Sequence, residues 1–212
     1  DEIRMSTADV VHMFNVPMIH YAIEDWRNAK KRITQALPQI TEEMLESNGE
    51  IYTDFFDEQF KHCLPPYGET VIDILLPYLK DFTGKTRCEF TDMWFQTAKR
   101  GMSHGVHNHG ASGWSAILYV DFNYTVHAAT RFYSPFKNPW NGNLEDYQPP
   151  VREGDLVIFP ASIAHEALRN DSEIPRTIIS FNLRGKVDYV KHTLWKDEGD
   201  PRIVIPRYRD DC

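Results

Sequence analysis

The sequence of 212 residues has little of what marks several large protein classes. It contains 3 cysteines, Cys63, Cys88 and Cys212, widely spaced and odd in number. This pattern matches no disulfide framework, zinc site or redox motif. No run approaches the roughly 18 apolar residues of a membrane span, and no signal-peptide pattern begins the chain. We therefore expect a cytoplasmic protein without a membrane segment.

The sequence also lacks an excess of positive charge. Its net charge is −8 with the histidines neutral, and the one short basic cluster, residues 30–32, lies in a segment with a helical pattern. A nucleic-acid-binding domain is usually basic on at least one face. The basic cluster is therefore interpreted as a solvated helix face, and no nucleic-acid partner is expected.

Internal repeats and low-complexity tracts are absent too, and the composition, 42% hydrophobic and 13% aromatic, is that of a globular protein. A chain of this length forms one domain most simply. We expect a single domain over residues 1–212. Within it, residues 1–86 supply a strand and helical support, residues 87–184 form a β core, and residues 185–212 form a C-terminal tail that could pack on the body or on a second subunit. A homodimer is thus one arrangement left open.

Two helices are predicted in the first part of the chain. Apolar residues at steps of three and four predict a helix from Glu24 to about Leu37, which Pro38 ends. A second helix runs from about Glu69 to Phe82, with Gly84 as its stop. A strand interrupted at Pro17 is predicted within residues 9–23, and residues 39–67 are expected to be irregular. The helices should buttress a sheet from outside.

From Gly84 onward the sequence predicts short strands separated by turns. Strands are expected at 87–98, from the histidine motif to Phe122, at 126–133, 156–160 and 176–183, with a turn at Glu153-Gly154-Asp155. The first has only partly alternating apolar residues, as in a strand buried on both faces or carrying a bulge. The segment 134–150, rich in proline and asparagine, is expected to be a loop. Such a pattern is typical of an all-β sandwich or barrel.

The feature with the clearest chemical meaning is the pair His107 and His109. Residues i and i+2 of an extended strand point to the same face, so both imidazoles could reach one metal ion. His165 follows a turn and a buried strand and could be a third ligand. Three imidazoles suit iron(II), zinc or copper. His104 is a competing ligand, whereas His12, His20 and His127 are interpreted as core or surface histidines.

Arg176 stands at the head of the strand that follows His165. If the two segments are antiparallel neighbours, its guanidinium can enter the same cavity, where it would bind a carboxylate through two hydrogen bonds. A metal beside a carboxylate receptor is what a molecule such as 2-oxoglutarate requires, because its keto acid end chelates the metal and its distal carboxylate meets the arginine.

The order of motifs makes this interpretation more specific. His-x-His, Ser-x-x-x-Tyr, Gly-Asp-Leu-Val-Ile-Phe-Pro, His and Pro-Arg-Thr-Ile-Ile-Ser-Phe-Asn follow one another over roughly residues 87–184. This order resembles the iron(II)- and 2-oxoglutarate-dependent oxygenases, in particular a 2OG-Fe(II) oxygenase group common in marine phages and bacteria. The resemblance implies a double-stranded β-helix (jelly roll, cupin-like) with the metal inside one open end. It also implies that the chain could be phage-encoded and act in the host cytoplasm.

The resemblance also implies roles for single residues. His107 and His165 would bind iron(II), Arg176 would anchor 2-oxoglutarate, and Tyr119, Ser180 and Asn182 would be further hydrogen-bonding candidates for this co-substrate. One departure stands out: most of the superfamily has a carboxylate two residues after the first histidine, and this chain has His109. The triad would then be three neutral histidines.

The expected activity is the hydroxylation of an unactivated C–H by iron(II), 2-oxoglutarate and O₂, with succinate as a product. The substrate would be a small molecule or a peptide. Residues proposed to face it are Trp114, Arg131 and Trp140, with Trp94, Phe132 and Tyr133 as further mouth residues and the loop 134–150 as a lid. Two rival functions remain open: a three-histidine, cupin-type dioxygenase that does not use 2-oxoglutarate, and a non-catalytic metal- or ligand-binding module.

Overall fold

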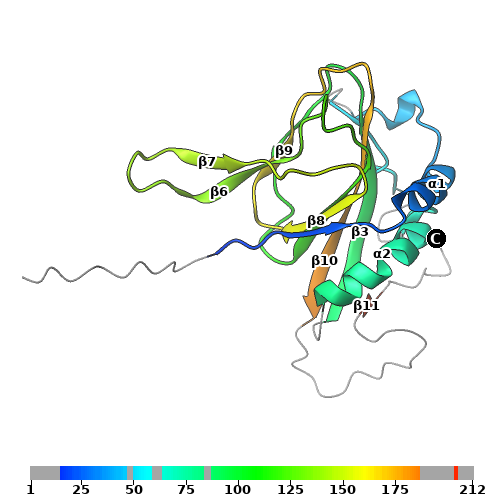
Figure 1. Cartoon of the computed structure of the whole chain (residues 1–212), viewed down its shortest axis with the longest axis horizontal. Coiled ribbons are helices and arrows are strands. Elements are labelled where there is room, and N and C mark those ends of the chain that lie inside the picture. The colour runs from blue at the N-terminus through cyan, green and yellow to red at the C-terminus, as the bar shows by residue number, and fades with distance from the viewer. Residues whose placement is uncertain (1–14, 47–49, 59–63, 84–86, 187–202, 205–212) are drawn as a thin grey trace, which may run out of the picture.

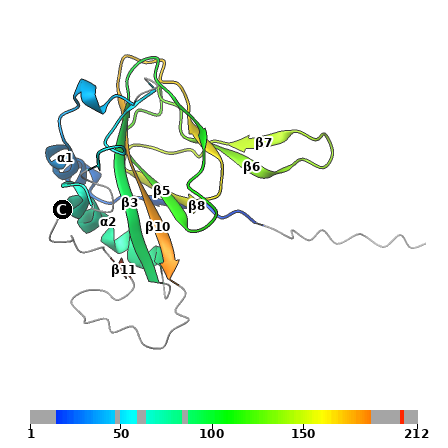
Figure 2. The same cartoon turned by 180° about the vertical axis from the view of Figure 1, so that it is seen from behind.

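The structure is a computed structural model that describes residues 15–46, 50–58, 64–83, 87–186 and 203–204. Two largely antiparallel sheets lie face to face, and two helices cover the outer face of the larger one (Figures 1 and 2). The expected mainly-β fold is therefore confirmed. The part of the predicted first strand before residue 15, the tail from 187 to 202 and from 205 onward, Cys63, Cys212 and His12 lie outside the described residues.

The large sheet has the strand order β1-β8-β5-β10-β3-β11, with β2 also paired to β3. Its bounds are β1 Ile19–Ala22, β2 Tyr52–Thr53, β3 Arg87–Ala98, β5 Trp114–Asp121, β8 Asp155–Pro160, β10 Arg176–Lys186 and β11 Ile203–Val204. The small sheet has the order β4-β9-β6-β7, with β4 His104–His107, β6 Arg131–Lys137, β7 Leu144–Tyr147 and β9 His165–Ala167. Segments far apart in the sequence thus pair as neighbours, as a jelly roll requires.

Alternation along the central strands gives the large sheet two different faces. On β10, Ile179 and Phe181 enter the core beneath the helices, whereas Ile178 and Ser180 face the small sheet. The register between β3 and β10 shifts by one residue: Asn182 of β10 pairs with Asp92 of β3, whereas the next residue, Leu183, pairs with Phe90. Of the two alternatives predicted for this strand, the bulge is therefore present, and it puts Phe90 and Met93 on the same face although they are three residues apart.

The predicted helices are confirmed with small changes of boundary. Helix α1 spans Trp26–Ala36 and α2 spans Gly68–Thr83, with a short 3-10 helix, η1, at Glu42–Met44. Ile33 of α1 and Leu75 of α2 are fully buried against the large sheet. The stripe of apolar residues therefore serves the core, as expected.

The turn before β8 holds α1 in place. Gly154 has φ +88°, and a Cβ at this residue would lie 2.6 Å from the ring of Trp26. Beside it, Glu153 accepts hydrogen bonds from Trp26 Nε1 at 3.1 Å and from Lys30 Nζ at 2.9 Å. The glycine is required for two reasons, because the backbone is left-handed and the indole ring leaves no room for a side chain.

Two predictions about the second half of the chain are wrong. The strand expected at 126–133 begins at Arg131, because the backbone N–H of His127 closes a turn onto Asn123 O. The expected loop 134–150 contains β7, which pairs with β6 in a hairpin that projects from the body (Figure 1). Asn138 and Asn141 accept hydrogen bonds from nearby backbone N–H groups, and Gly142 has φ +70°. The residues that suggested a loop form the tip of this hairpin.

Candidate metal and co-substrate site

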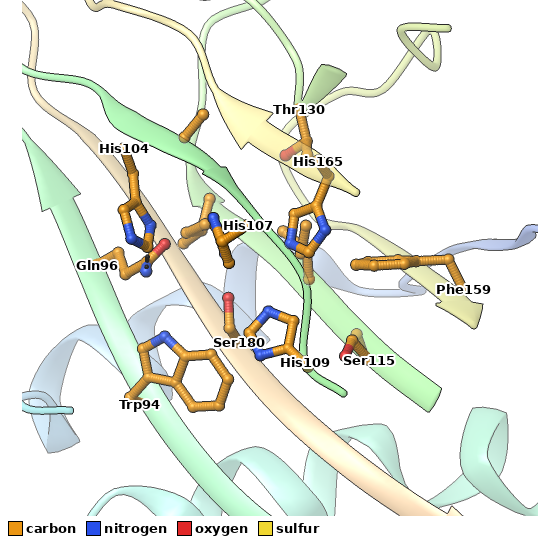
Figure 3. Close-up of a pocket in the computed structure, with 14 residues that line it drawn as sticks. Trp94, Gln96, His104, His107, His109, Ser115, Thr130, Phe159, His165 and Ser180 are labelled. Carbon is orange, nitrogen blue, oxygen red and sulfur yellow. Dashed lines mark hydrogen bonds between the residues drawn. The ribbon is translucent and has the colours of Figure 1, made fainter. Parts of the chain in front are cut away.

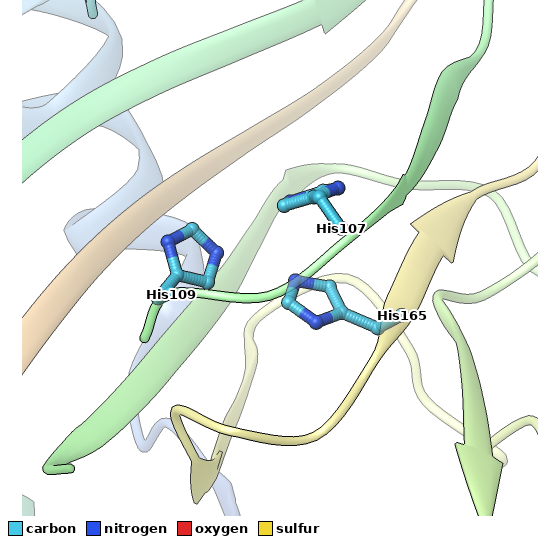
Figure 4. A group of neighbouring side chains, drawn as sticks. All are labelled: His107, His109 and His165. Atoms are coloured by element: carbon cyan, nitrogen blue, oxygen red, sulfur yellow. The ribbon is translucent and has the colours of Figure 1, made fainter. Parts of the chain in front are cut away.

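His107, His109 and His165 converge between the two sheets (Figure 4). One nitrogen from each ring lies within 4.8 Å of the others, and the ring centroids of His107 and His165 are 4.4 Å apart. The backbone explains this meeting, because His107 and His165 are directly paired residues of β4 and β9. The structure therefore brings together the three predicted ligands from two distant parts of the sequence.

The orientation of two of these rings is set by their own loops. Nδ1 of His107 lies 2.7 Å from the carbonyl oxygen of Gly105, and Nδ1 of His165 lies 2.9 Å from that of Ile163. A carbonyl only accepts, so each Nδ1 carries the proton and each Nε2 keeps its lone pair. Metal-binding histidines are commonly fixed in this way, which leaves Nε2 free to coordinate.

His109 is held differently. Strand β4 ends at His107, so the premise that both histidines share one strand is only half correct. The backbone N–H of His109 donates to Ala161 O at 2.8 Å, and its ring lies 5.3 Å from that of Trp94. His109 thus lies in a loop after β4, and its backbone hydrogen bond to the segment before His165 positions its ring at the site.

The protonation of the site suits a metal cation. Burial, followed by repulsion from His107, lowers the pKa of His165 to about 3 and that of His109 to about 4. Both rings are therefore neutral at pH 7, which is the form that binds a metal. Three imidazole nitrogens fit iron(II), and no carboxylate belongs to this group of three.

The rival ligand His104 lies next to the site but outside the group of three. Its ring stacks on His107 with centroids 4.2 Å apart, and its Nδ1 is 3.1 Å from Gln96 Nε2. Its remaining neighbours with ligand atoms are Glu46 and Glu50. The geometry thus favours His109 over His104 as the third ligand.

Arg176 is the most unusual charged residue near the metal group. Its side chain is buried, 5% exposed, and its two terminal nitrogens donate to Ala128 O and Leu168 O, both at 2.9 Å. Burial lowers its pKa, while the adjacent Tyr119 raises it. Within the described part of the chain, no ion pair is found for this guanidinium. A buried cation bonded only to neutral carbonyls is expected to bind an anion.

The route by which Arg176 reaches the site differs from the prediction. Its strand does not neighbour the His165 strand, since β10 and β9 belong to opposite sheets. Arg176 instead shares a face of β10 with Ile178 and Ser180, which line the pocket beside the histidines (Figure 3). The guanidinium therefore points from the large sheet toward the small one.

The other predicted co-substrate residues occupy the same layer. Tyr119 is buried and donates to Thr130 Oγ1 at 3.1 Å, and Thr130 lines the pocket. Asn182 accepts a hydrogen bond from Ser115 Oγ at 2.8 Å and lies at the edge of the site. The pocket itself is narrow, with about 10 Å³ of space for a water-sized molecule, so a ligand must displace side chains as it enters.

Three predicted substrate residues do not lie at this pocket. Trp114 packs against Phe82 of α2, because it alternates with Ser115 and so faces the helices. Arg131 lies on the outer face of the small sheet, where its Nε is 3.3 Å from Asp146. Trp140, 94% exposed, is at the tip of the hairpin. A lid function for residues 134–150 also lacks support, because the hairpin projects away from the body (Figures 1 and 2).

The remaining predicted residues divide in the same way. Trp94 lines the pocket, as expected, and Phe132 lies 5.8 Å from the ring of His165. Tyr133 faces outward and bonds Glu166. His127 is a structural histidine, as interpreted, since its nitrogens bond Asn123 N and Ile174 O.

Several pocket residues were missed by the sequence-based prediction. These are Gln96, Ser115, Ile117, Thr130, Phe159 and Ile178. Most lie at alternate positions of strands that were recognised, in register with Trp94, Tyr119 or Ser180. Strand alternation was therefore the available signal, but it could not say which of the two faces would carry the site.

The comparisons with known proteins agree with this geometry. Residues 92–182 match the model of the family described as "Putative 2OG-Fe(II) oxygenase". This segment contains all three histidines and Arg176. No sequence among the curated proteins matches the chain.

Solved structures share the fold at low sequence identity. A 2OG-Fe(II) oxygenase family oxidoreductase from Burkholderia pseudomallei has a TM-score of 0.55 and 13% identity, over 79% of this chain and 84% of the other. The epimerase SnoN, in complex with Fe3+, alpha ketoglutarate and nogalamycin RO, gives 0.57 and 13% over 92% of both chains. The viral collagen prolyl hydroxylase vCPH from Paramecium Bursaria Chlorella virus-1 gives 0.52 and 13%, over 80% of this chain and 96% of the other.

These similarities show the double-stranded β-helix fold. In the described part of the chain, no helix is long and apolar enough to span a membrane. The chain is thus similar to the 2OG-Fe(II) oxygenases in the segment that carries the site and in its fold.

Proposed function

We propose that this enzyme binds iron(II) through His107, His109 and His165, binds the distal carboxylate of 2-oxoglutarate through Arg176, and hydroxylates a C–H bond of a small molecule or peptide. The observation that carries this proposal is the buried guanidinium of Arg176, which has only neutral carbonyl partners among the described residues and lies on the same face of β10 as the pocket residues Ile178 and Ser180. Iron(II) with 2-oxoglutarate and O₂ supplies an oxidant able to attack an unactivated C–H bond, releasing succinate and CO₂.

The residues of the chain have distinct tasks in this scheme. The carbonyls of Gly105 and Ile163 hold the protons of His107 and His165 on Nδ1, so that both Nε2 atoms point into the pocket. Arg176 fixes one end of the co-substrate by a charge-assisted pair. Tyr119, Thr130 and Ser180, on the same layer, supply hydroxyl groups for its remaining oxygens. Because the pocket is narrow, a bound co-substrate would leave little room for bulk solvent at the metal.

Three histidines in place of two and a carboxylate change the charge of the site. With neutral imidazoles alone the protein adds no negative charge to iron(II), so the metal keeps its full attraction for an anionic keto acid. Binding of 2-oxoglutarate should therefore be favourable at the metal end as well as at Arg176.

The test is an anaerobic titration of iron(II)-loaded protein with 2-oxoglutarate. Chelation through the keto acid end produces a visible charge-transfer band, and oxygen consumption in the presence of a competent substrate should then be coupled to succinate. Iron-loaded protein that develops no band would contradict the use of 2-oxoglutarate and favour the three-histidine dioxygenase. The control is Arg131→Met, which removes an outward-facing arginine and should leave the band unchanged.

A further inference from the structure

A second cleft lies directly beside the histidine pocket. It measures about 310 Å³, and Phe159 lines both spaces. The ring centroid of Phe159 is 4.8 Å from that of His165 (Figure 3), and the ring centroid of Phe132, another wall residue, is 5.8 Å from it. Ile163, whose carbonyl oxygen bonds His165 Nδ1, lines the cleft as well. The inner wall of the cleft is therefore made of residues that contact or orient His165.

The cleft and Arg176 lie on opposite sides of His165 along the chain segment 163–168. Ile163 lines the cleft, and His165 follows two residues later with the metal group. The carbonyl oxygen of Leu168, three residues further along, accepts a hydrogen bond from Arg176. The metal group thus stands between the cleft and the guanidinium on this segment.

Strand β6 and the residues before it repeat this order on the neighbouring segment. Ala128 O accepts the other hydrogen bond from Arg176, and Phe132 is directly paired with His165. Residues 134–135 then line the cleft. A co-substrate held by Arg176 would therefore approach the metal group from one side and leave the cleft side for another molecule.

The walls of the cleft are mainly apolar and aromatic. Such side chains come from the segment before β1 and from both sheets: Val16, Pro17, Met18, Phe132, Pro135, Tyr147, Phe159 and Ile163. Of the two carboxylates in the lining, Glu145 accepts from Asn138 Nδ2 at 2.6 Å, and Asp146 lies 3.3 Å from Nε of Arg131. No lysine, arginine or histidine is among the described residues that line it. A cleft of this size with largely apolar walls is typical of a small-molecule site.

The inner end of the cleft is already ordered. The rings of Phe132 and Phe159 meet edge to face, with centroids 4.7 Å apart and planes at 71°. Both side chains are buried. Pro17 and Pro135 restrict the backbone of the two facing walls. A ligand that packs on these rings would therefore bind with little ordering of the protein.

We propose that this cleft is the substrate subsite beside the metal group, and that it binds an apolar ring of the substrate. The ring would pack on Phe132 and Phe159, where its removal from water supplies most of the affinity. The reacting carbon would enter the narrow histidine pocket past Phe159, whose side chain turns aside as the substrate arrives. A polar ring would lose hydration in the cleft without compensation. This inference rests on the proposed function, since it names the substrate class of the same site.

Two uncharged probes with the same hydroxyethyl tail test the chemistry of the cleft. 2-Naphthaleneethanol carries an apolar double ring, and 9-(2-hydroxyethyl)adenine carries a polar double ring of similar size. Each is titrated calorimetrically into the full chain loaded with zinc, so that binding is read without turnover. The naphthalene probe should bind at least about tenfold more tightly, because its ring is apolar throughout and leaves no polar atom unpaired.

The variants locate the bound ring. Tyr147→Ala removes an aromatic wall and should weaken binding of the naphthalene probe by about threefold or more. Ser134→Trp places a large side chain in the cleft and should abolish binding. The matched control is Tyr124→Ala, which removes another exposed tyrosine that does not line the cleft. This variant should bind both probes as the parent protein does.

The charge-transfer band tests whether the cleft serves the metal group. A ring bound in the cleft packs on Phe132 and Phe159, which both contact His165. The naphthalene probe should therefore shift the band of iron-loaded protein with 2-oxoglutarate. Tyr147→Ala should require a correspondingly higher probe concentration for the same shift.

Equal affinity for the two probes, no binding of the naphthalene probe, or an equal loss in Tyr124→Ala would each overturn the proposal. So would binding in the cleft that leaves the band unchanged, since the cleft would then hold a molecule other than the substrate. Failure of the proposed function looks different. In that case the naphthalene probe binds with the expected preference, but iron-loaded protein develops no band with 2-oxoglutarate at all.

Discussion

The two faces of the large sheet come from the same strands but differ in the side chains that they bury. Toward the helices, alternate residues such as Leu118, Ile158 and Ile179 are fully buried and wholly apolar. Toward the small sheet, their neighbours include Ser180, Tyr119 and Arg176, which are buried but polar or charged. One face thus buries only apolar side chains, whereas the other also buries polar and charged groups that could bind a ligand.

This difference shows how the fold separates stability from chemistry. Removing apolar surface from water is the main favourable term in folding, and the helix side supplies it. A guanidinium and a cluster of imidazoles in the interior cost free energy unless a ligand compensates. Substitutions on the face toward the small sheet, the site face, should therefore weaken ligand binding but change the free energy of unfolding little. Substitutions on the face toward the helices, the helix face, should lower the free energy of unfolding but leave ligand binding unchanged in the folded protein.

The largest effect is expected from His165→Ala, which removes a proposed metal ligand that the small sheet presents to this face. Iron binding should fall below detection, because two remaining imidazoles leave the metal without its third donor. Metal content after dialysis measures this, with His104→Ala as the matched control. If His104→Ala loses iron and His165→Ala keeps it, the group of three is wrongly assigned.

Arg176→Met sharpens the comparison within the site face. Loss of one partner of a buried charge pair costs about 2 kcal/mol or more, which is at least about 30-fold in affinity for 2-oxoglutarate. Affinity for iron(II) should not change, because Arg176 is not a ligand. Titration of the charge-transfer band gives both constants. Unchanged co-substrate affinity would assign the anchor to another residue.

Two adjacent residues of β10 test the faces directly. Ile179→Ala leaves a cavity beneath the helices and should lower the free energy of unfolding by about 2–5 kcal/mol. Ser180→Ala, on the opposite face, should lower it by less than about 1 kcal/mol. Urea unfolding of the metal-free variants is the measurement. Equal losses would mean that the site face contributes to stability as much as the core does.

A last prediction concerns pH. Burial and mutual repulsion lower the pKa of His104 and His109 to about 4 and that of His165 to about 3, below the ordinary 6.5. The unfolded chain then binds more protons than the folded one, so the metal-free protein should lose stability as pH falls from 6.5 toward 5. Asp54 acts in the opposite sense, because burial raises its pKa to about 6.

Urea unfolding at several pH values measures this slope. His165→Asn should reduce the loss on acidification, and Asp54→Asn should increase it because the opposing group is gone. A free energy of unfolding that stays constant between pH 6.5 and 5 in the parent protein would contradict the lowered pKa values of the histidines.

Much of the fold could be predicted because the spacing of apolar residues along the sequence indicates helices and strands. The helices that became α1 and α2 followed from apolar residues at steps of three and four, and the strands around Leu118, Ile158 and Ile179 from short apolar runs between turns. The hairpin β6–β7 escaped prediction because turn residues at its tip resemble those of a loop, and because its β7 strand is exposed along its whole length. Without burial, a strand has no apolar alternation to reveal it.

The candidate site, like the fold, could be predicted only in part. The sequence alone supplied the candidate site residues and their order, His107, His109, His165 and then Arg176, in a pattern that resembles one oxygenase family. Only the tertiary structure decided which side of each strand faces the candidate metal site. It placed Trp114 against a helix, Arg131 on the outside, and Phe159 in the wall that the histidine pocket shares with the neighbouring cleft. The reason is physical: alternation gives every strand two faces, and only packing against a second sheet or a helix makes them different.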